Sequence, residues 1–515
     1  MDRNLVLFHL ESLNCLNYYM NQDFFPTLKE IEKKSVSFSR FYASATSTFM
    51  IMGDLAYGED HVLESLKTMD WRVENKSKPK SLFDKLKDKG YYVRIIDYPP
   101  NGADAHSMSL NGFVGNRVTL EEFSEKEQYI STINECIGHE EPFALWVCNF
   151  LSHIDFGVYE MEELDGLNRW GEGYRRVDKA VSQLFTALED KGLLGSTSVV
   201  FYGDHGDDFY SHGYRGGLTH AIEPYEQLIH TPMFVYDERL RPQIRHDLIG
   251  TCDIADIIGF LLKTDAVNNS LLDTTNHSYV FSRNMFAAQR VRTKTFDKGY
   301  SVTDGSFLLV VCSKGMSMYY TVMDPTCQNN LLSLFCVNDG TIQPREEINE
   351  YRFHFKYLMD EKSLQLIEDK YNELFPVLYK KTLEYYKSGG CDERIYEMNF
   401  SGIADTCNDA EYLRRDNKNE SYFDVFYPYV DNKNVILYGA GNYGKYCYYH
   451  IKDRCRIIAW VDERCEELMD QRVSPPQIIC TSEYDVIYIA ISNGRDMQDV
   501  YNQLIEWGVD RKKIV

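Results

Sequence analysis

The chain has 515 residues, with 55 basic and 78 acidic side chains and a formal net charge of −23. The length predicts two or three domains, and the negative charge argues against nucleic acid and anionic membranes as main partners. No apolar run approaches the roughly 20 residues of a membrane-spanning helix, and no signal peptide is visible. The 13 cysteines form no CxxC pair, which is typical of reduced thiols. We therefore expect a globular, cytoplasmic protein with no integral membrane segment.

Strand and helix patterns alternate through the first 240 residues. Strand patterns cover residues 4–10, 35–42, 91–96, 143–150 and 198–202, and helix patterns begin near residue 26 and cover residues 81–89 and 173–191. The last of these helices has apolar residues at spacings of 3, 4, 3 and 4. The alternation predicts an α/β fold, with a mostly parallel sheet covered by helices on both faces.

Residues 199–220, VVFYGDHGDDFYSHGYRGGLTH, contain the most suggestive stretch. An apolar strand ends in Gly203-Asp204-His205-Gly206. A carboxylate beside an imidazole at a strand end suits a divalent metal, and we expect the glycines to permit a sharp turn. Taken alone, an Asp-His pair is more often part of an ordinary surface turn.

Three other segments carry reactive side chains next to strand ends. Glu11 follows the first strand, Thr48 opens an apolar helical run, and His153 follows the strand over residues 143–150. Each has a simpler interpretation, as a turn cap, a helix N-cap or a structural hydrogen bonder. The carboxyl ends of parallel strands lie at one sheet edge, so we expect these groups to meet Asp204 and His205 there. This convergence favours a metal site.

These patterns resemble the sulfatase-like part of the alkaline phosphatase superfamily, especially its threonine-nucleophile members, the lipoteichoic-acid synthases and phosphoethanolamine transferases. The matching stretches are LVLFHLES, FPTLKEIEKKSVSFSRFYASATST, GYRRVDKAVSQLFTALEDKGLLGSTSVVFYGDHGD and THAIEPYEQLIHTPMFVY. The segment with Asp324-Pro325 resembles the end of such a domain, so the likeness covers about residues 1–335. The resemblance implies that Glu11, Thr48, Asp204 and His205 are metal ligands.

The resemblance also implies roles in catalysis and substrate binding. Thr48 would be the nucleophile, and His153 and His220 would contact the transferring group or protonate the leaving group. Weaker candidates for substrate contacts are His212, Arg117 and His106.

One departure from the sulfatases changes the expected chemistry. Formylglycine sulfatases need Cys or Ser in a C-x-P-S-R motif, and here Thr48 stands at that position, with Ile51 and Met52 in place of the Ser and Arg. The resemblance therefore favours attack of a Thr48 alkoxide on a small-molecule or glycan phosphoester, in bacterial capsule or surface-glycan metabolism. We expect Mn²⁺ or Zn²⁺, with Mg²⁺ and Ca²⁺ as alternatives.

The remainder of the chain predicts a helical connector over residues 336–430 and a small Rossmann-like α/β domain over residues 431–515. The latter has a strand, the pattern Gly439-x-Gly441-x-x-Gly444, a helix start and a second strand ending at Asp462. This order is typical of dinucleotide sites and resembles small domains of surface-polysaccharide enzymes. A nucleotide or nucleotide-sugar site and a purely structural or assembly role, including a homo-oligomer, are both left open.

Two other functions remain in view. One is a sulfatase that hydrolyses sulfate esters at the same site. The other is a catalytically inactive scaffold whose C-terminal domain senses a nucleotide.

Overall fold

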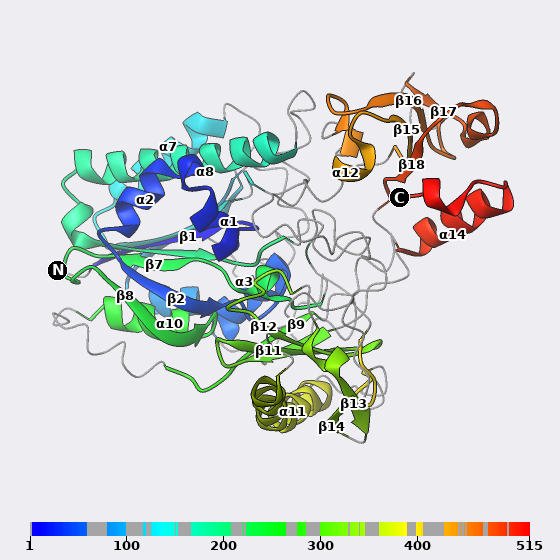
Figure 1. Ribbon diagram of the computed structural model, residues 1–515. Helices are drawn as coiled ribbons and strands as arrows, with labels where there is room; N and C mark the ends of the chain where they lie inside the picture. Colours follow the sequence, from blue (N-terminus) through cyan, green and yellow to red (C-terminus); the bar gives the residue numbers. More distant parts are fainter. Residues whose placement is uncertain are drawn as a thin grey trace.

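Figure 1 shows the computed structural model of the chain. It describes residues 3–58, 80–98, 117–119, 125–149, 151–152, 166–207, 220, 223–263, 276–284, 299–327, 330–338, 340–345, 360–388, 398–404, 427–440, 444, 447–448, 451–466, 472–491 and 494–515.

An eight-stranded sheet forms the centre of the N-terminal half, with the strand order β4-β3-β5-β1-β6-β7-β2-β8. Its strands are β1 (Asn4–Leu10), β2 (Val36–Tyr42), β3 (Tyr92–Tyr98), β4 (Arg117–Thr119), β5 (Phe143–Asn149), β6 (Thr197–Gly203), β7 (Met233–Tyr236) and β8 (Gln243–Gly250). All neighbouring strands are parallel except β7, which runs antiparallel to β6 and β2. The predicted mostly parallel sheet is confirmed.

Helices cover both faces of this sheet (Figure 1). One face carries α2 (Pro26–Glu32), α7 (Glu125–Ile137) and α8 (Gly166–Asp190), and the other carries α3 (Thr48–Tyr57), α5 (Leu82–Asp88) and α10 (Asp253–Leu261). Strand β1 shows why: Val6 and Phe8 face the core under α2, α7 and α8, whereas Leu5 and Leu7 face the opposite core. The strand is therefore apolar on both faces, as parallel strands buried between two helix layers are.

Shorter elements complete the layout. They are α1 (Cys15–Met20), α9 (Glu226–Ile229), α12 (Tyr427–Val430) and the 3₁₀ turns η1 (Gln22–Phe24), η4 (Leu194–Ser196), η8 (Leu331–Leu334), η12 (Pro476–Thr481) and η13 (Arg511–Lys513).

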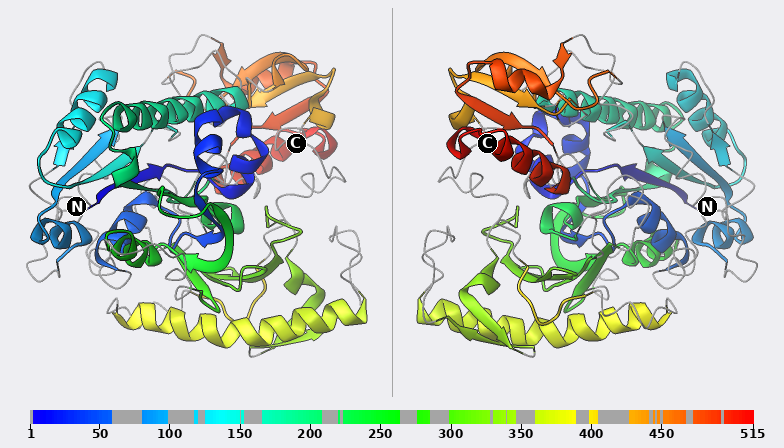
Figure 2. Two further views of the ribbon diagram at one scale, coloured as in Figure 1. Left: turned by 90° about the vertical axis from the view of Figure 1, so that its left-hand side faces the viewer. Right: turned by 90° about the vertical axis from the view of Figure 1, so that its right-hand side faces the viewer.

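A second, antiparallel sheet lies beside the first, with the order β12-β11-β10-β9. Its strands are β9 (Val280–Asn284), β10 (Gly299–Thr303), β11 (Phe307–Cys312) and β12 (Gly315–Tyr320). The long helix α11 (Glu361–Ser388) runs along it (Figure 2) and buries Tyr371 and Leu374 in the core of this sheet.

The segment predicted as a helical connector is therefore only partly helical. Helix α11 is present, but the hairpin of β13 (Phe335–Asn338) and β14 (Thr341–Pro344) precedes it and packs in the same core. The alternating pattern of this short hairpin was not recognised in the sequence. Although α11 has 28 residues, it is rich in charged side chains. Within the described ranges, no helix has both the length and the hydropathy to cross a membrane.

Near the C-terminus the chain forms a four-stranded sheet with the order β17-β16-β15-β18, in which all pairs are parallel. The strands are β15 (Asn434–Tyr438), β16 (Arg456–Val461), β17 (Val473–Ser474) and β18 (Val486–Ile489), and α14 (Gly494–Glu506) packs against β18. Both predicted strands and the acid after the second one are present. The division of the whole chain into three domains stays a prediction.

Candidate active site

Two central strands bring Glu11 and Asp204 together. Strands β1 and β6 are parallel neighbours, and Leu10 pairs with Gly203, so the next residue of each strand leaves the sheet at the same level. Ser12 then turns with a positive φ of 56°, and its backbone N–H donates to Asp204 Oδ1 at 3.1 Å. An uncommon backbone conformation thus holds the ends of two strands together.

The glycines around Asp204 and His205 are there because of close packing. A Cβ on Gly203 would lie 2.7 Å from the carbonyl oxygen of Leu13, and one on Gly206 would lie 2.0 Å from that of Gln227. Neither glycine has a positive φ. The expectation that they permit a sharp turn is therefore wrong, since the space beside the backbone, and not its dihedral angles, requires a residue without a side chain.

Thr48 reaches the same point from helix α3. The helix begins at Thr48, and Ser47 is its N-cap but makes no side-chain capping bond. The Thr48 hydroxyl oxygen lies 3.3 Å from each carboxylate oxygen of Glu11 and 3.0 Å from His205 Nε2. The side chain that the sequence marked as nucleophile thus touches two of its expected neighbours.

The imidazole of His205 has a defined orientation. Its Nδ1 lies 3.0 Å from the carbonyl oxygen of Gly206, which can only accept a hydrogen bond, so Nδ1 carries a proton. In the neutral ring, Nε2 then holds a lone pair that faces Thr48 and the Asp204 Oδ2 at 3.2 Å. A backbone carbonyl behind the ring commonly orients a metal-binding histidine in this way.

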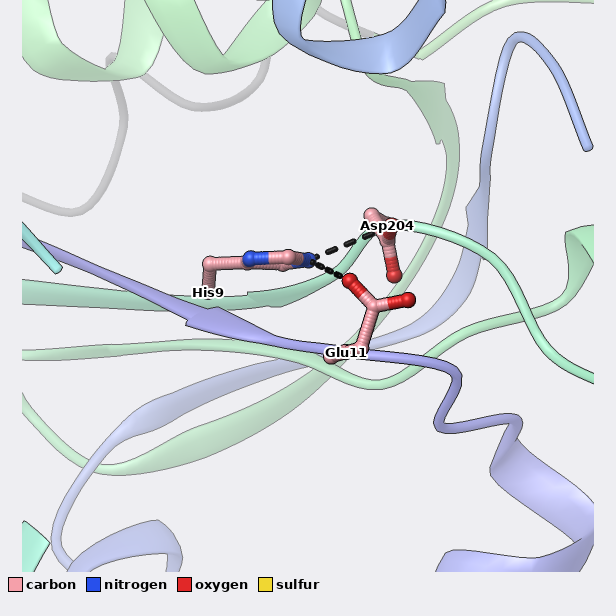
Figure 3. A group of neighbouring side chains, drawn as sticks. All are labelled: His9, Glu11 and Asp204. Carbon is pink, nitrogen blue, oxygen red and sulfur yellow. Dashed lines mark ion pairs between the residues drawn. The ribbon is translucent and has the colours of Figure 1, made fainter. Parts of the chain in front are cut away.

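His9 joins this group, although the sequence analysis did not select it. Its Nε2 lies 3.2 Å from Glu11 Oε2 and 3.2 Å from Asp204 Oδ2 (Figure 3). The signal was spacing: His9 and Glu11 are two residues apart, and such residues in a strand share one face. The histidine was overlooked because it lies inside an apolar run.

Charge compensation is strong in this fully buried cluster. Burial would lower the pKa of His9, but the carboxylates of Asp204 and Glu11 raise it to about 10. Burial would raise the pKa of Asp204, but the charges of His205 and His9 hold it well below its usual range. Two buried carboxylates thus need nearby positive charge, which imidazolium or a bound cation supplies.

The distances between donor atoms fit a single cation. Ligands at right angles and about 2.1 Å from an ion lie about 3.0 Å apart. The contacts among Thr48 Oγ1, His205 Nε2 and Asp204 Oδ2 include separations of 3.0 and 3.2 Å, and those to Glu11 include 3.3 Å. Glu11, Thr48, Asp204 and His205 would therefore hold the metal, and the ligand atoms of His9, Glu11 and Asp204 also lie within 4.8 Å of one another.

His220 lies next to the same cluster. Its Nδ1 is 3.0 Å from Asp207 Oδ1, and its ring centre is 4.3 Å from that of His205. Burial would lower the pKa of His220, but the hydrogen bond and charge of Asp207 raise it to about 9. Asp207, which the sequence analysis did not select, therefore orients the imidazole of His220 beside His205.

Several predicted contacts cannot be placed. His106, His153, His212 and Gly441 lie outside the described residues, and for Arg117 only the backbone, in β4, is described. The residue before His153, Ser152, donates its hydroxyl to the Glu11 carbonyl at 2.8 Å. The chain therefore passes beside the site just before His153.

The described glycines after β15 are held by hydrogen bonds to the end of β16 and by close packing. Gly439 has a φ of 111°, and its carbonyl accepts from Trp460 Nε1 at 2.7 Å. A Cβ on Gly444 would lie 2.0 Å from the Gly439 oxygen. Asp462 accepts the backbone N–H of Ala440 at 2.8 Å, so this carboxylate holds the turn. Nucleotide binding here stays a prediction.

Comparison with known proteins supplies an independent observation. The profile of the family described as Sulfatase matches residues 3–263, and that described as C2185-like, N-terminal matches residues 431–515. Human arylsulfatase A is 26% identical over 139 residues, which are 26% of this chain and 27% of that protein. The lipoteichoic acid synthase-like YvgJ of Bacillus subtilis is 23% identical over 234 residues, covering 39% of this chain and 37% of that protein. The chain thus spans well under half the length of these relatives.

Solved structures agree with the fold. A 2-O GAG sulfatase, BT1596, superposes with a TM-score of 0.53 and 15% identity, covering 78% of this chain and 95% of that one. A candidate sulfatase from Bacteroides thetaiotaomicron gives 0.52 and 16%, with the same coverage.

Proposed function

Because the chain belongs to the sulfatase family, we propose that it uses Thr48 as a nucleophile to hydrolyse or transfer a phosphoester group with the help of a divalent metal. The observation that carries this proposal is the contact of the Thr48 hydroxyl with both Glu11 and His205, at 3.3 and 3.0 Å. Thr48 is the first helical residue and the N-cap is Ser47, so the Thr48 hydroxyl is not taken up by helix capping.

The chain's own residues account for most of the proposed reaction. A divalent cation held by Glu11, Thr48, Asp204 and His205 would favour the Thr48 alkoxide and polarise a phosphoryl oxygen. The alkoxide attacks phosphorus in line, so a bond from Thr48 to phosphorus forms while the bond to the leaving oxygen breaks. Thr48 is the first residue of α3, and the partial positive charge and backbone N–H groups of a helix N-terminus would favour an anionic phosphoryl group there.

His220 is the proposed proton donor for the leaving oxygen. Its Nδ1 lies 3.0 Å from Asp207 Oδ1, and its ring centre lies 4.3 Å from that of His205, so the imidazole is held next to the proposed metal site. The phosphothreonine then passes its group to water or to a sugar hydroxyl, with His220 taking back a proton. His153 is a second candidate for contact with the transferred group.

A threonine favours phosphoester over sulfate-ester chemistry in this proposal. The formylglycine of the resembling sulfatases forms from Cys or Ser, and Thr48 is neither. The likeness to the lipoteichoic acid synthase-like YvgJ supports a phosphoglycerol- or phosphoethanolamine-type substrate, a glycan precursor or a related small molecule. The likeness to arylsulfatase A favours a second candidate, hydrolysis of sulfate esters at the same site.

A substrate panel separates the two candidates. Metal-depleted protein would be supplied with Mn²⁺ or Zn²⁺ and assayed with bis(p-nitrophenyl) phosphate, p-nitrophenyl phosphate and p-nitrophenyl sulfate. We expect metal-dependent turnover of a phosphate substrate by the wild type, and none by Thr48→Ala. Thr197→Ala is the matched control, because Thr197 is equally buried at the opposite end of β6. Turnover of the sulfate alone would contradict the proposal.

A further inference from the structure

The loop that presents Thr48 is held by a residue from the second sheet. The backbone N–H of Arg283, in β9, donates to the Ser44 carbonyl at 3.0 Å, and the N–H of Thr46 donates to the Arg283 carbonyl at 3.3 Å. Ala45 and Arg283 thus form an isolated parallel bridge. Residues 44–46 are fixed to β9 only two positions before the proposed nucleophile.

The side chain of Arg283 fixes the other end of the same segment. Its guanidinium donates to Asp54 Oδ1 in helix α3 at 2.7 Å and to the Ser44 carbonyl at 3.3 Å. Asp54 accepts with its second oxygen from the Ser44 hydroxyl at 2.6 Å. Arg283 and Asp54 have fully buried side chains, so this ion pair is shielded from water and salt.

Helix α11 covers the arginine from the other side. The ring of Tyr385 lies with its centre 5.3 Å from the Arg283 guanidinium carbon, within the range of a cation–π contact. The Lys381 ammonium lies 4.9 Å from the same ring. Arg283 is therefore enclosed between α3 and α11, and it has little freedom to move.

We propose that Arg283 is a positioning residue that sets the start of helix α3, and with it the location of the Thr48 hydroxyl. This inference rests on the proposed function for its catalytic consequence. Arg283 lies outside the region of the sulfatase profile, residues 3–263. The second sheet would thus contribute to the geometry of the active site without supplying a catalytic residue.

The planar guanidinium is essential to this role. It bonds to Asp54 and to the Ser44 carbonyl at the same time through two nitrogens held in one plane. A lysine side chain ends in a single ammonium group and cannot reproduce this planar geometry. Arg283→Lys keeps the buried charge pair, whereas Arg283→Met removes the charge and leaves the carboxylate of Asp54 without it. The Lys variant therefore tests position with the least loss of stability.

The matched control is a second buried Arg–Asp pair in the described part of the chain. Arg3 pairs with Asp237 at 3.0 Å, next to the opposite ends of β1 and β6. Arg3→Met should destabilise the fold in the same manner as Arg283→Met but leave the segment around Thr48 unchanged. Differences between the two sets of variants then report on position.

Three measurements test the inference on the full chain. By hydrogen exchange with mass spectrometry, amides of residues 44–57 should exchange faster in Arg283→Lys than in Arg3→Met. By calorimetric titration, Mn²⁺ should bind about tenfold more weakly to Arg283→Lys than to the wild type. With bis(p-nitrophenyl) phosphate, kcat should fall about 100-fold with little change in KM.

The outcomes separate this inference from the proposed function. If Arg283→Lys matches Arg3→Met in exchange of residues 44–57, in Mn²⁺ affinity and in kcat, Arg283 has only a structural role and the inference is overturned. If the wild type neither binds Mn²⁺ nor turns over any substrate, the proposed function fails, and the hydrogen exchange of residues 44–57 alone still decides whether Arg283 positions the helix.

Discussion

The hydroxyl oxygen of Thr48 lies 3.0 Å from Nε2 of His205, although the two residues are 157 positions apart in the chain. Thr48 is the first residue of helix α3, and His205 follows the end of β6. Beside both lies Glu11 from the end of β1, with its Oε1 3.3 Å from the threonine oxygen and 3.7 Å from His205 Nε2. Three elements from different parts of the sequence therefore meet in one small buried volume.

Replacing the threonine tests its role as nucleophile. We expect Thr48→Ala to lower kcat at least about 10³-fold, because the atom that attacks is gone. Thr48→Ser keeps a hydroxyl on the same carbon and should retain measurable turnover. Steady-state kinetics with bis(p-nitrophenyl) phosphate checks both. Equal activity of the alanine variant and the wild type would mean that another group attacks.

Metal removal should affect stability as well as activity. A ligand present at 100 times its Kd adds about 2.7 kcal/mol to the free energy of unfolding. Mn²⁺ should therefore raise the thermal midpoint of metal-depleted wild type but not that of Asp204→Asn. This variant keeps an oxygen to accept the Ser12 N–H, which is 3.1 Å away. An equal rise in the variant would show that the ion binds elsewhere.

The contribution of Asp207 and His220 to kcat should depend on the pKa of the leaving group. If His220 protonates the leaving oxygen, Asp207→Asn should lower kcat about 100-fold for an alkyl phosphate ester, whose alkoxide needs the proton. The loss should be much smaller for p-nitrophenol esters, which leave as stable anions. Rates for a series of leaving groups of different pKa would check this. A loss that does not depend on the leaving group would assign the pair a different role.

The buried ion pair of Arg3 and Asp237, at the end of the sheet away from Thr48, predicts a pH dependence of the free energy of unfolding. Burial would raise the pKa of Asp237, but hydrogen bonds from Arg239 and Ser198 hold it below its usual value. A carboxyl with a lowered folded pKa stabilises the fold above its unfolded pKa of about 3.9, and this contribution disappears as the pH falls through the folded pKa. Asp237→Asn should cost about 3 kcal/mol at pH 7.

Urea unfolding of the wild type and Asp237→Asn at several pH values measures this difference. The gap between the two free energies should narrow as the pH drops below about 4. A gap that is constant with pH would show that the charge of Asp237 contributes nothing. Because Asp237 bonds to Ser198 at the start of β6, whereas Asp204 and His205 follow the end of that strand, kcat of the folded variant should stay at the wild-type level.

The main sheet could be predicted because its signals are local. Each buried strand is an apolar run, and the amphipathic pattern of residues 173–191 marks a helix, so the layers follow from periodicity. The structure brings Glu11, Thr48, Asp204 and His205 together, as expected from the shared edge of parallel strands. Their chemical roles remain predictions.

Other features depend on contacts between distant parts of the chain. His9 shares a strand face with Glu11, but a spacing of two residues is common along any strand and does not by itself single out this histidine as a partner of Glu11. The hydrogen bonds of Arg283 join residues 229 positions apart in sequence, and no local pattern marks such a pair. The glycines beside Asp204 and His205 are needed because of neighbouring backbone at Leu13 and Gln227, which only the folded chain reveals.

The most direct test of the central claim is to trap the covalent intermediate. Metal-loaded protein would be mixed with bis(p-nitrophenyl) phosphate, quenched with acid within milliseconds to seconds and digested for mass spectrometry. We predict a p-nitrophenylphosphoryl adduct on the peptide containing Thr48, because the attack displaces one p-nitrophenolate and keeps the other; this adduct should be absent from Thr48→Ala. Turnover that persists in Thr48→Ala, with no adduct on Thr48 in the wild type at any time, would contradict it.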